Sequence, residues 1–372
     1  MLKLNFSKPL IKNTFLFLFL NINLFLLVPL GNFTLTACST TEPPDIKPPV
    51  EPDSTTQNFT FETFEFGDGF SSSYLNDVWI FNENNIWAVG YISPSDTING
   101  VYISNPNIIK WDGANWALQP YSGTSSGIYG IWAVDSSHIY FASGNIIKYK
   151  NNTYVNIIVQ GNWTQGQQIE KLWGSSENNI WGVGPWGTIV HFDGTAWSKI
   201  DFDQQWSFTA ISGNAENGIA YTVGRNTNFN PIIVKLTGNL PEIIYQSNQQ
   251  ITALKSYSVL YLNEALFLAG SDLINTLLWK YDITNNNIDS LYSLEATTAI
   301  VKTTGEKETD LYYWGRDYNS GKMFHFNGKK YKGFDLPRAS ITTGGAYTRG
   351  NISAVVGYAE NKGYVTLVKR IP

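Results

Sequence analysis

Ile86-Trp87-Ala88-Val89-Gly90 is a short apolar segment that ends in glycine, and the chain contains six further segments like it, five of which also end in glycine. The seven copies are residues 86–90, 139–143, 180–184, 220–224, 266–270, 311–315 and 353–357. Their last residues are 53, 41, 40, 46, 45 and 42 positions apart. A period of about 40 to 50 residues with several short strands per unit is typical of a β-propeller blade. The repeats therefore predict an all-β chain with seven blades.

Each repeat has room for four short strands, and the third repeat shows them most clearly. The expected strands there are residues 169–174, 180–184, 188–192 and 197–202. Asp193-Gly194 joins the last two strands and is a strong hairpin signal, because both turn positions favour a positive φ. The second strands are apolar throughout, which predicts a position buried on both faces. Their closing glycine indicates a tight exit near the central channel.

The seventh repeat lacks a fourth strand, and the other end of the folded region supplies a candidate for it. The strands expected in this repeat are residues 341–347, 352–357 and 364–369. Residues 58–66 carry four phenylalanines at nearly alternating positions: Phe59, Phe61, Phe64 and Phe66. One break in the alternation would fit a β-bulge. We expect residues 58–66 to pair with residues 364–369 and close the ring.

Residues 1–37 have the pattern of a lipoprotein signal peptide. Lys3, Lys8 and Lys12 precede an apolar stretch, which a small-residue cleavage site follows. The segment Leu35-Thr36-Ala37-Cys38 resembles the bacterial lipobox, and this resemblance implies cleavage before Cys38 and lipid attachment to it. An ordinary cleaved signal and an uncleaved membrane anchor are the alternatives. Cys38 is the only cysteine in 372 residues, so it has no internal disulfide partner, and lipid attachment gives it a role.

The segment after the lipidated cysteine is predicted to be a tether. Residues 39–57 contain five prolines, four acidic residues and little that could form a core. We therefore expect residues 38–57 to remain disordered and extended. At about 3.1 Å per residue in the polyproline conformation, the segment could reach roughly 60 Å from a membrane. Residues 58–372 are expected to form the propeller.

The charge of the mature chain disfavours nucleic acid as a partner. Removing residues 1–37 takes away three of the 25 basic residues and none of the 30 acidic ones, which leaves a formal charge of −8. An acidic chain does not favour phosphate backbones or an anionic membrane surface. The predicted contact with the membrane is therefore the lipid on Cys38.

The repeats also resemble a propeller repeat of exported bacterial proteins that is grouped with kelch-like or sialidase-type repeats. The shared features are Ile-Trp-x-Val-Gly, a following Gly-x-Ile, and Asp-Gly-x-x-Trp. The first and third repeats match closely, whereas the fourth, fifth and seventh lack the Asp-Gly-x-x-Trp part. The resemblance implies a fold but no function. Together with the lipobox, it predicts a lipoprotein of the bacterial cell envelope, at the outer membrane, facing either the periplasm or the cell surface.

The sequence predicts no catalytic residues, metal ligands or cofactor. His191 and His325 occupy equivalent places in their repeats, where the first repeat has Lys110, so we interpret this place as a strand-surface position. Metal-binding cysteine clusters and acidic calcium loops are absent from the sequence. A sialidase needs three arginines, a tyrosine–glutamate pair and an aspartate. The chain has five arginines and lacks the family's Ser-x-Asp-x-Gly-x-x-Trp box.

The predicted ligand surface lies on the loops that follow the second and fourth strands of each blade. Seven residues on these loops are candidates: Trp163, Trp186, Trp206, Arg225, Arg316, Asp317 and Tyr318. Flat aromatic rings beside amides and cations suit a glycan or a protein ligand. The alternative is that these tryptophans pack against neighbouring blades.

The predicted function is a membrane-anchored, non-catalytic binding or scaffold module. The alternative is a glycan-active propeller enzyme, either a sialidase-like hydrolase or a lyase. An acid or a tyrosine–glutamate pair facing the central channel, with arginines around it, would distinguish the enzyme.

Overall fold

The computed structural model describes residues 54–372 except 94–95, 99–100, 104–106, 120, 122–126, 203–204, 239, 248–256, 272–275, 295–297, 318 and 340–341. Glu51–Pro372 forms one compact unit. The predictions for the signal peptide, for Cys38 and for most of the tether concern residues outside the described part.

In the described part of the chain, twenty-eight strands form seven four-stranded antiparallel sheets, which are the blades. Blades 1 and 2 contain β2 (Tyr74–Asn82), β3 (Asn85–Tyr91), β6 (Ile108–Trp111) and β7 (Trp116–Leu118), then β8 (Gly130–Asp135), β9 (His138–Ala142), β10 (Ile146–Lys150) and β11 (Thr153–Ile157). Blades 3 and 4 contain β12 (Lys171–Ser176), β13 (Asn179–Val183), β14 (Ile189–Phe192) and β15 (Trp197–Lys199), then β16 (Ser207–Asn214), β17 (Ile219–Arg225), β18 (Pro231–Thr237) and β19 (Leu240–Gln246).

Blades 5 and 6 contain β20 (Tyr257–Leu262), β21 (Ala265–Ser271), β22 (Thr276–Asp282) and β23 (Asn287–Leu294), then β24 (Ala299–Lys307), β25 (Asp310–Arg316), β26 (Ser320–Phe326) and β27 (Tyr331–Ala339). Blade 7 contains β28 (Thr342–Arg349), β29 (Ile352–Ala359), β30 (Lys362–Arg370) and β1 (Phe59–Phe66). A short hairpin of β4 (Asp96–Ile98) and β5 (Val101–Ile103) lies between β3 and β6 in the chain.

The first strands of successive blades form a closed ring. Each contacts the next in the order β2, β8, β12, β16, β20, β24 and β28, and β28 contacts β2 again. The predicted all-β, seven-bladed propeller is confirmed, and the described residues contain no helix.

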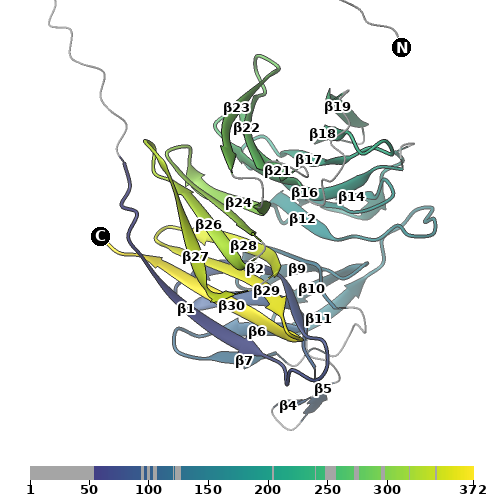
Figure 1. Cartoon of the computed structure of the whole chain (residues 1–372). Coiled ribbons are helices and arrows are strands. Elements are labelled where there is room, and N and C mark those ends of the chain that lie inside the picture. Colours follow the sequence, from purple (N-terminus) through teal and green to yellow (C-terminus); the bar gives the residue numbers. More distant parts are fainter. Residues whose placement is uncertain are drawn as a thin grey trace, which may run out of the picture. The chain divides into compact units, whose positions relative to one another are not determined.

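The predicted closure of the ring by the N-terminal strand is also confirmed. β1 pairs with β30 over eight residues, from Phe59 opposite Arg370 to Phe66 opposite Gly363. The two strands come from opposite ends of the described chain and lie side by side in Figure 1. The pairing has no register shift, so the expected bulge in this strand is wrong. The contacts of the propeller begin before the boundary predicted at Asn58, because Thr55 Oγ1 donates a hydrogen bond to Asp310 (3.2 Å) in blade 6.

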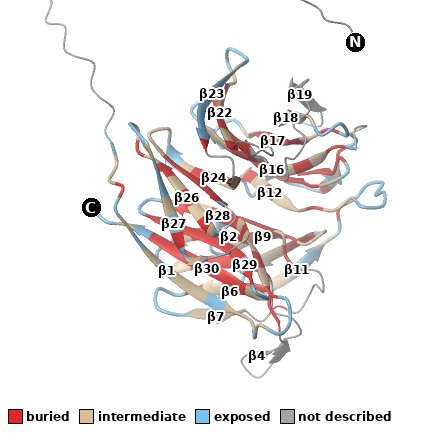
Figure 2. Cartoon of the chain, viewed as in Figure 1, coloured by how far each residue is buried: buried red, intermediate tan, exposed pale blue. Residues whose placement is uncertain are grey.

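The core is divided among the interfaces between blades. Seven apolar clusters of described residues each join two neighbouring blades around the ring. Buried residues follow the middle strands of the sheets, while exposed residues gather at turns and outer edges (Figure 2). The second strands are buried on both faces, as predicted; Ile180, Trp181 and Val183 of β13 are at most 1% exposed. Burial between two blades explains why these strands are apolar throughout.

The glycine that ends most second strands lies where a side chain would crowd the neighbouring backbone, as expected. A Cβ at Gly90, Gly224 or Gly315 would lie 2.0–2.1 Å from a carbonyl oxygen at the start of the first strand of the same blade. In each of these blades the first strand has a register shift directly opposite the glycine. The structure adds that the crowded neighbour is a β-bulge in the innermost strand, which the repeated glycine accommodates.

The Asp-Gly hairpins form, but through a different turn from the one expected. Gly113 and Gly194 have a positive φ, whereas the aspartates before them do not. Instead, the Asp193 carboxylate accepts hydrogen bonds from the backbone N–H groups of Thr195 (2.8 Å) and Ala196 (2.9 Å). The aspartate thus caps the turn with its side chain. In the related Asn151-Asn152 turn, both residues have a positive φ.

Candidate functional site

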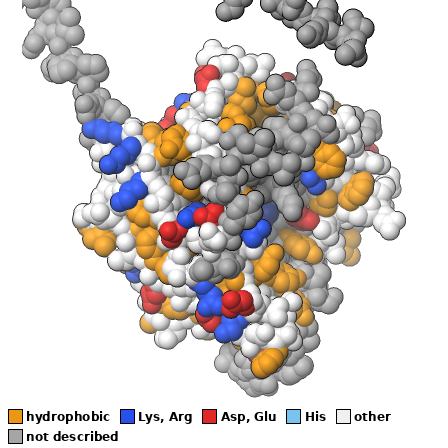
Figure 3. All heavy atoms as spheres, viewed as in Figure 1, with side chains coloured by type: hydrophobic (Ala, Val, Ile, Leu, Met, Phe, Trp, Pro, Cys, Tyr) orange, Lys and Arg blue, Asp and Glu red, His pale blue; other side chains and the backbone are white. Residues whose placement is uncertain are grey.

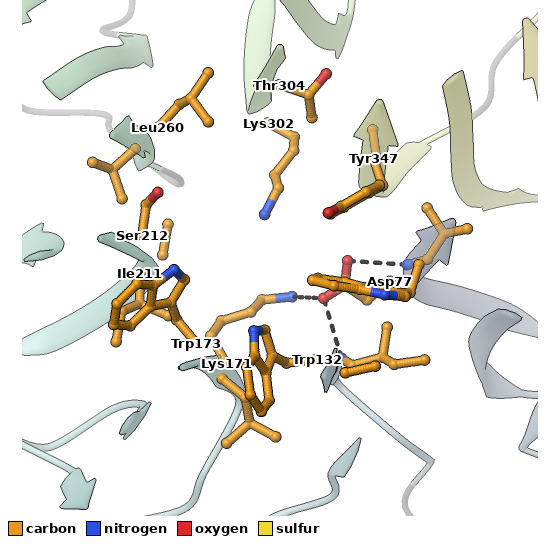
Figure 4. A pocket seen from close by; sticks show the side chains of 18 of the residues that line it. Asp77, Trp132, Lys171, Trp173, Ile211, Ser212, Leu260, Lys302, Thr304 and Tyr347 are labelled. Atoms are coloured by element: carbon orange, nitrogen blue, oxygen red, sulfur yellow. Dashed lines mark hydrogen bonds and ion pairs between the residues drawn. The ribbon is translucent and has the colours of Figure 1, made fainter. Parts of the chain in front are cut away.

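The innermost strands enclose a channel of about 400 Å³ that side chains from all seven blades line (Figure 4). Strand register places these side chains in two layers. Three charged residues of the first strands each pair with the fourth residue of the second-strand repeat. They are Asp77 in blade 1, Lys171 in blade 3 and Lys302 in blade 6. These three residues form a charged layer of the channel.

An adjacent layer of the channel wall consists of the first-strand residues that pair with the second residue of the same repeat. Four blades place an aromatic ring there, namely Trp79, Trp132, Trp173 and Tyr347. The other three blades place smaller side chains there, namely Ser212, Leu260 and Thr304. One side of this aromatic layer is therefore flat and bulky, and the opposite side has more space.

Glycines of neighbouring blades hold two of the indoles in place. A Cβ at Gly174 would lie 2.7 Å from the Trp132 ring, and a Cβ at Gly213 would lie 2.7 Å from the Trp173 ring. Each indole therefore lies against the backbone of the next blade. This packing makes the aromatic layer a fixed wall of the channel.

Asp77 and Lys171 form a partly buried pair. Lys171 Nζ lies 3.7 Å from Asp77 Oδ2 and donates a hydrogen bond to the Tyr129 carbonyl (2.9 Å). The same carboxylate accepts hydrogen bonds from the backbone N–H groups of Val78 (3.0 Å) and Ile131 (3.4 Å). Both charged groups are thus already engaged within the protein.

Lys302 differs from the other two charged residues of the layer. Its ammonium group points into the channel and has no hydrogen-bond or ion-pair partner among the described residues (Figure 4). Burial lowers the pKa of Lys302, the carboxylate of Asp77 acts in the opposite direction, and the charge of Lys171 lowers it further. The ammonium is therefore incompletely compensated, and an anion would satisfy it.

The three tryptophans of the predicted ligand surface have different environments. Trp163 is 37% exposed and donates a hydrogen bond from Nε1 to the Val159 carbonyl (3.3 Å). Trp186 is 50% exposed, with its ring against Gly166. Trp206 is only 5% exposed and packs in the cluster between blades 3 and 4, so its expected exposure is wrong. Gln167 Nε2 donates to the Trp186 carbonyl (3.0 Å), which joins the loops that carry the two exposed indoles.

The charged candidates lie on other blades. Arg225 ends β17 and places its guanidinium 4.9 Å from the centre of the Phe229 ring. Arg316 ends β25 and donates a hydrogen bond to Thr342 Oγ1 (3.2 Å). Asp317 pairs with Lys322 (3.0 Å), and Tyr318 lies outside the described residues. Arg316 and Asp317 thus contact residues of blades 7 and 6.

The feature expected to distinguish an enzyme is present only in part. Asp77 faces the channel, and Tyr347 and Glu306 both line it. Burial is the main cause that raises the pKa of Tyr347 to about 12, and the charge of Glu306 adds to it, whereas Arg349 opposes it. No arginine is among the described residues that line the channel. The channel therefore has carboxylates and a tyrosine, with lysines in place of the expected arginines.

The two repeat-equivalent histidines are buried, so their interpretation as strand-surface residues is wrong. The His191 ring stacks on Trp181 at 3.8 Å, and its Nε2 lies 2.7 Å from Asn179 Oδ1. His325 Nε2 lies 2.7 Å from Asp310 Oδ1. Within the described ranges, no group of three or more His, Cys, Asp or Glu side chains is arranged to hold a metal ion. Those ranges also hold no helix that is long and apolar enough to cross a membrane.

The fold and channel define a seven-bladed β-propeller with WD40-type structural neighbours. A structure described as YCF48 bound to D1 peptide matches with a TM-score of 0.60 and 9% identity, covering 86% of this chain and 99% of that one. A mitotic checkpoint complex chain matches with a TM-score of 0.59 and 12% identity, covering 91% and 99%. The WD40 propeller domain of Doa1 matches with a TM-score of 0.59 and 12% identity, covering 84% and 97%. At these identities the likeness concerns the fold alone.

Comparisons with protein-family models and with curated protein sequences give no match.

The channel residues lie on the first strands, so the patterns of the second strands and the loops did not predict them. A signal was nevertheless present. Asp77, Lys171 and Lys302 all occur in first strands, two residues before the position that carries Trp79, Trp173 and Thr304. Charged residues at equivalent places in apolar strands would have indicated a shared polar environment.

Proposed function

We propose that this chain is a lipid-anchored binding or scaffold module of the bacterial cell envelope. The observation that carries the binding role is the closed ring, which presents loops and a lined channel on a rigid frame. Loops on a rigid scaffold commonly carry binding residues. Two solved structures of similar fold, one bound to D1 peptide and one from a mitotic checkpoint complex, support a protein or peptide as the ligand.

The membrane anchor in this proposal rests on the lipobox-like segment that ends in Cys38. The attached lipid would hold the chain at the outer membrane, on the periplasmic or the surface side. We expect Cys38→Ala to lose lipid labelling and to leave the membrane fraction, while Ser39→Ala behaves like the natural chain. A Cys38→Ala protein that still carries lipid and sediments with membranes would contradict the anchor.

The proposed recognition surface is the pair of joined loops that carry Trp163 and Trp186. Exposed indoles with two rotatable side-chain bonds contribute strongly to binding when a partner buries them. Partner capture from envelope extracts tests this with the natural chain, Trp186→Ala and the control Val155→Ala, which changes an exposed residue on β11. We expect only Trp186→Ala to lose a captured partner. Equal capture by all three proteins would exclude this surface.

A glycan-active enzyme is the second candidate, because Asp77, Tyr347 and Glu306 line the channel. Such an enzyme would release product from a fluorogenic sialoside or cleave an acidic polysaccharide, and Asp77→Asn would abolish the turnover. Binding without turnover is the outcome that supports the module.

A further inference from the structure

The channel combines an uncompensated cation with a flat apolar wall. Asp77 and Lys171 satisfy each other, whereas Lys302 has no partner in the described part of the chain. Two further carboxylates lie near Lys302 and have partners of their own: Glu306 lines the channel, and Glu170 lines a second cavity that Lys302 also lines. Glu306 accepts a hydrogen bond from the Gly350 N–H (3.1 Å), and Glu170 accepts one from Gln168 (2.6 Å).

The position of Lys302 is fixed by the fold. β24 has a register shift between Ile300 and Lys302, opposite Gly315, and this bulge precedes the lysine directly. Thr303 is anchored by a hydrogen bond from its N–H to Ser258 Oγ (2.6 Å) in the preceding blade, blade 5. The backbone on both sides of Lys302 is thus held, so that its ammonium is presented to the channel. A buried charge held in this way without a partner destabilises a fold unless a ligand supplies the opposite charge.

The aromatic layer determines what else the ligand must have. Trp132 and Trp173 stand against glycines of the next blade, so the rings form a rigid apolar wall. Ser212, Leu260 and Thr304 leave more space on the opposite side. A volume of about 400 Å³ is in the range of sites for small molecules.

We propose that the central channel binds a small organic carboxylate with a flat apolar body. The carboxylate pairs with Lys302, and the flat body lies along Trp132 and Trp173. Lys171 contributes a second, weaker attraction because Asp77 already engages it. This site lies inside the ring, apart from the loops of blade 3, and the inference does not depend on the partner proposed for that surface.

Matched probes test the two parts of the proposal in the full chain by calorimetric titration. The probes are 3-phenylpropionate and indole-3-acetate, their neutral amides, and inorganic phosphate. We expect the carboxylates to bind at least tenfold more tightly than their amides, and more tightly than phosphate, because only they satisfy both Lys302 and the wall. Equal affinity of acid and amide, or no binding of either acid at millimolar concentration, would overturn the proposal.

Two variants with opposite expected effects on affinity test where the acids bind. Lys302→Met should weaken the binding of both acids at least tenfold, and Asp77→Asn should tighten it, because it removes a competing carboxylate and releases Lys171. Lys150→Met, which changes an exposed lysine on β10, is the matched control and should bind like the natural chain. Thermal melts establish that each variant is folded. If folded Lys302→Met binds the acids as tightly as the natural chain does, the assigned site is wrong.

Discussion

At the scale of the residue, one glycine position links the repeat to the channel. Gly90 and Gly315 lie opposite the bulges that precede Asp77 and Lys302. A side chain at either glycine would meet a carbonyl oxygen of the innermost strand. The glycine thus permits the bulge, and the bulge places the next charged side chain in the channel wall.

Replacing Gly315 with alanine should destabilise the chain by about 3 kcal/mol, because the new Cβ would lie 2.0 Å from the Ala299 carbonyl oxygen. Gly350→Ala is the control. Gly350 has a positive φ of 56° but no atom within 4 Å of a Cβ, so it should lose only about 1 kcal/mol. Urea unfolding measures both changes. Similar losses in the two variants would mean that backbone conformation, rather than the close approach of the carbonyl oxygen, explains why glycine occupies position 315.

The two tryptophans that look alike in the sequence should respond differently to truncation. Trp206→Ala should cost about 3–5 kcal/mol, because it empties a space in the cluster between blades 3 and 4. Trp186→Ala should cost less than about 1 kcal/mol, because half of the ring is exposed and alanine keeps the same backbone strain at a φ of 57°. Thermal melts compare them. A large loss in Trp186→Ala would show that this ring is also a packing residue.

At the scale of the element, β1 joins blade 7 to both of its neighbours. Phe59 and Phe61 point to blade 6, where they contact Phe334 at 5.2 and 6.3 Å between ring centres. Phe64 and Phe66 point to blade 1, where they contact Trp116 at 6.1 and 5.9 Å. The break in the phenylalanine alternation therefore marks a change of face in a regular strand.

A chain that begins at Phe70 should melt at a much lower temperature than one that begins at Ser54. It loses eight residues of pairing with β30 and uncovers apolar side chains on blades 1, 6 and 7. The double variant Phe59→Ala/Phe64→Ala keeps the backbone pairing and should show an intermediate loss. Equal melting temperatures for the chains that begin at Ser54 and Phe70 would rule out closure by β1.

At the scale of the whole molecule, a polar cluster joins the two ends of the described chain to blade 6. Asp310 contacts Arg370 near the C-terminus, Thr55 near the start of the described residues, and His325 of β26 (2.7 Å). Burial opposes the ionisation of Asp310, but hydrogen bonds and charges from His325 and Arg370 outweigh it, so that the pKa lies below its ordinary value. The ionised carboxylate therefore stabilises the closed ring.

Asp310→Asn should lower the free energy of unfolding at pH 7 by about 2–3 kcal/mol, because it leaves Arg370 without its charge partner. In the natural chain, the contribution of Asp310 is fully present above the unfolded-state pKa of about 4, and is lost as the pH falls through the lower folded-state pKa. The difference between the two proteins should therefore shrink below pH 4 in urea unfolding. A difference that stays constant down to pH 2 would show that the ionisation of Asp310 does not stabilise the closed ring.

The sequence by itself determined the number of blades, their four-stranded build and the closing strand. These features depend on short patterns: apolar second strands, hairpin turns and alternating phenylalanines. Each pattern involves residues that are close together in the sequence. The candidate lipidation of Cys38 is likewise a local pattern, and it remains a prediction.

Only the tertiary structure decided which side chains share the channel and which tryptophans face solvent. Asp77, Lys171 and Lys302 come from three blades, and ring closure brings them into one layer. Trp186 and Trp206 both lie in loops of blade 3, yet only the cluster between blades 3 and 4 determines that one is exposed and the other buried. Burial and charge compensation depend on neighbours distant in sequence, which local patterns do not specify.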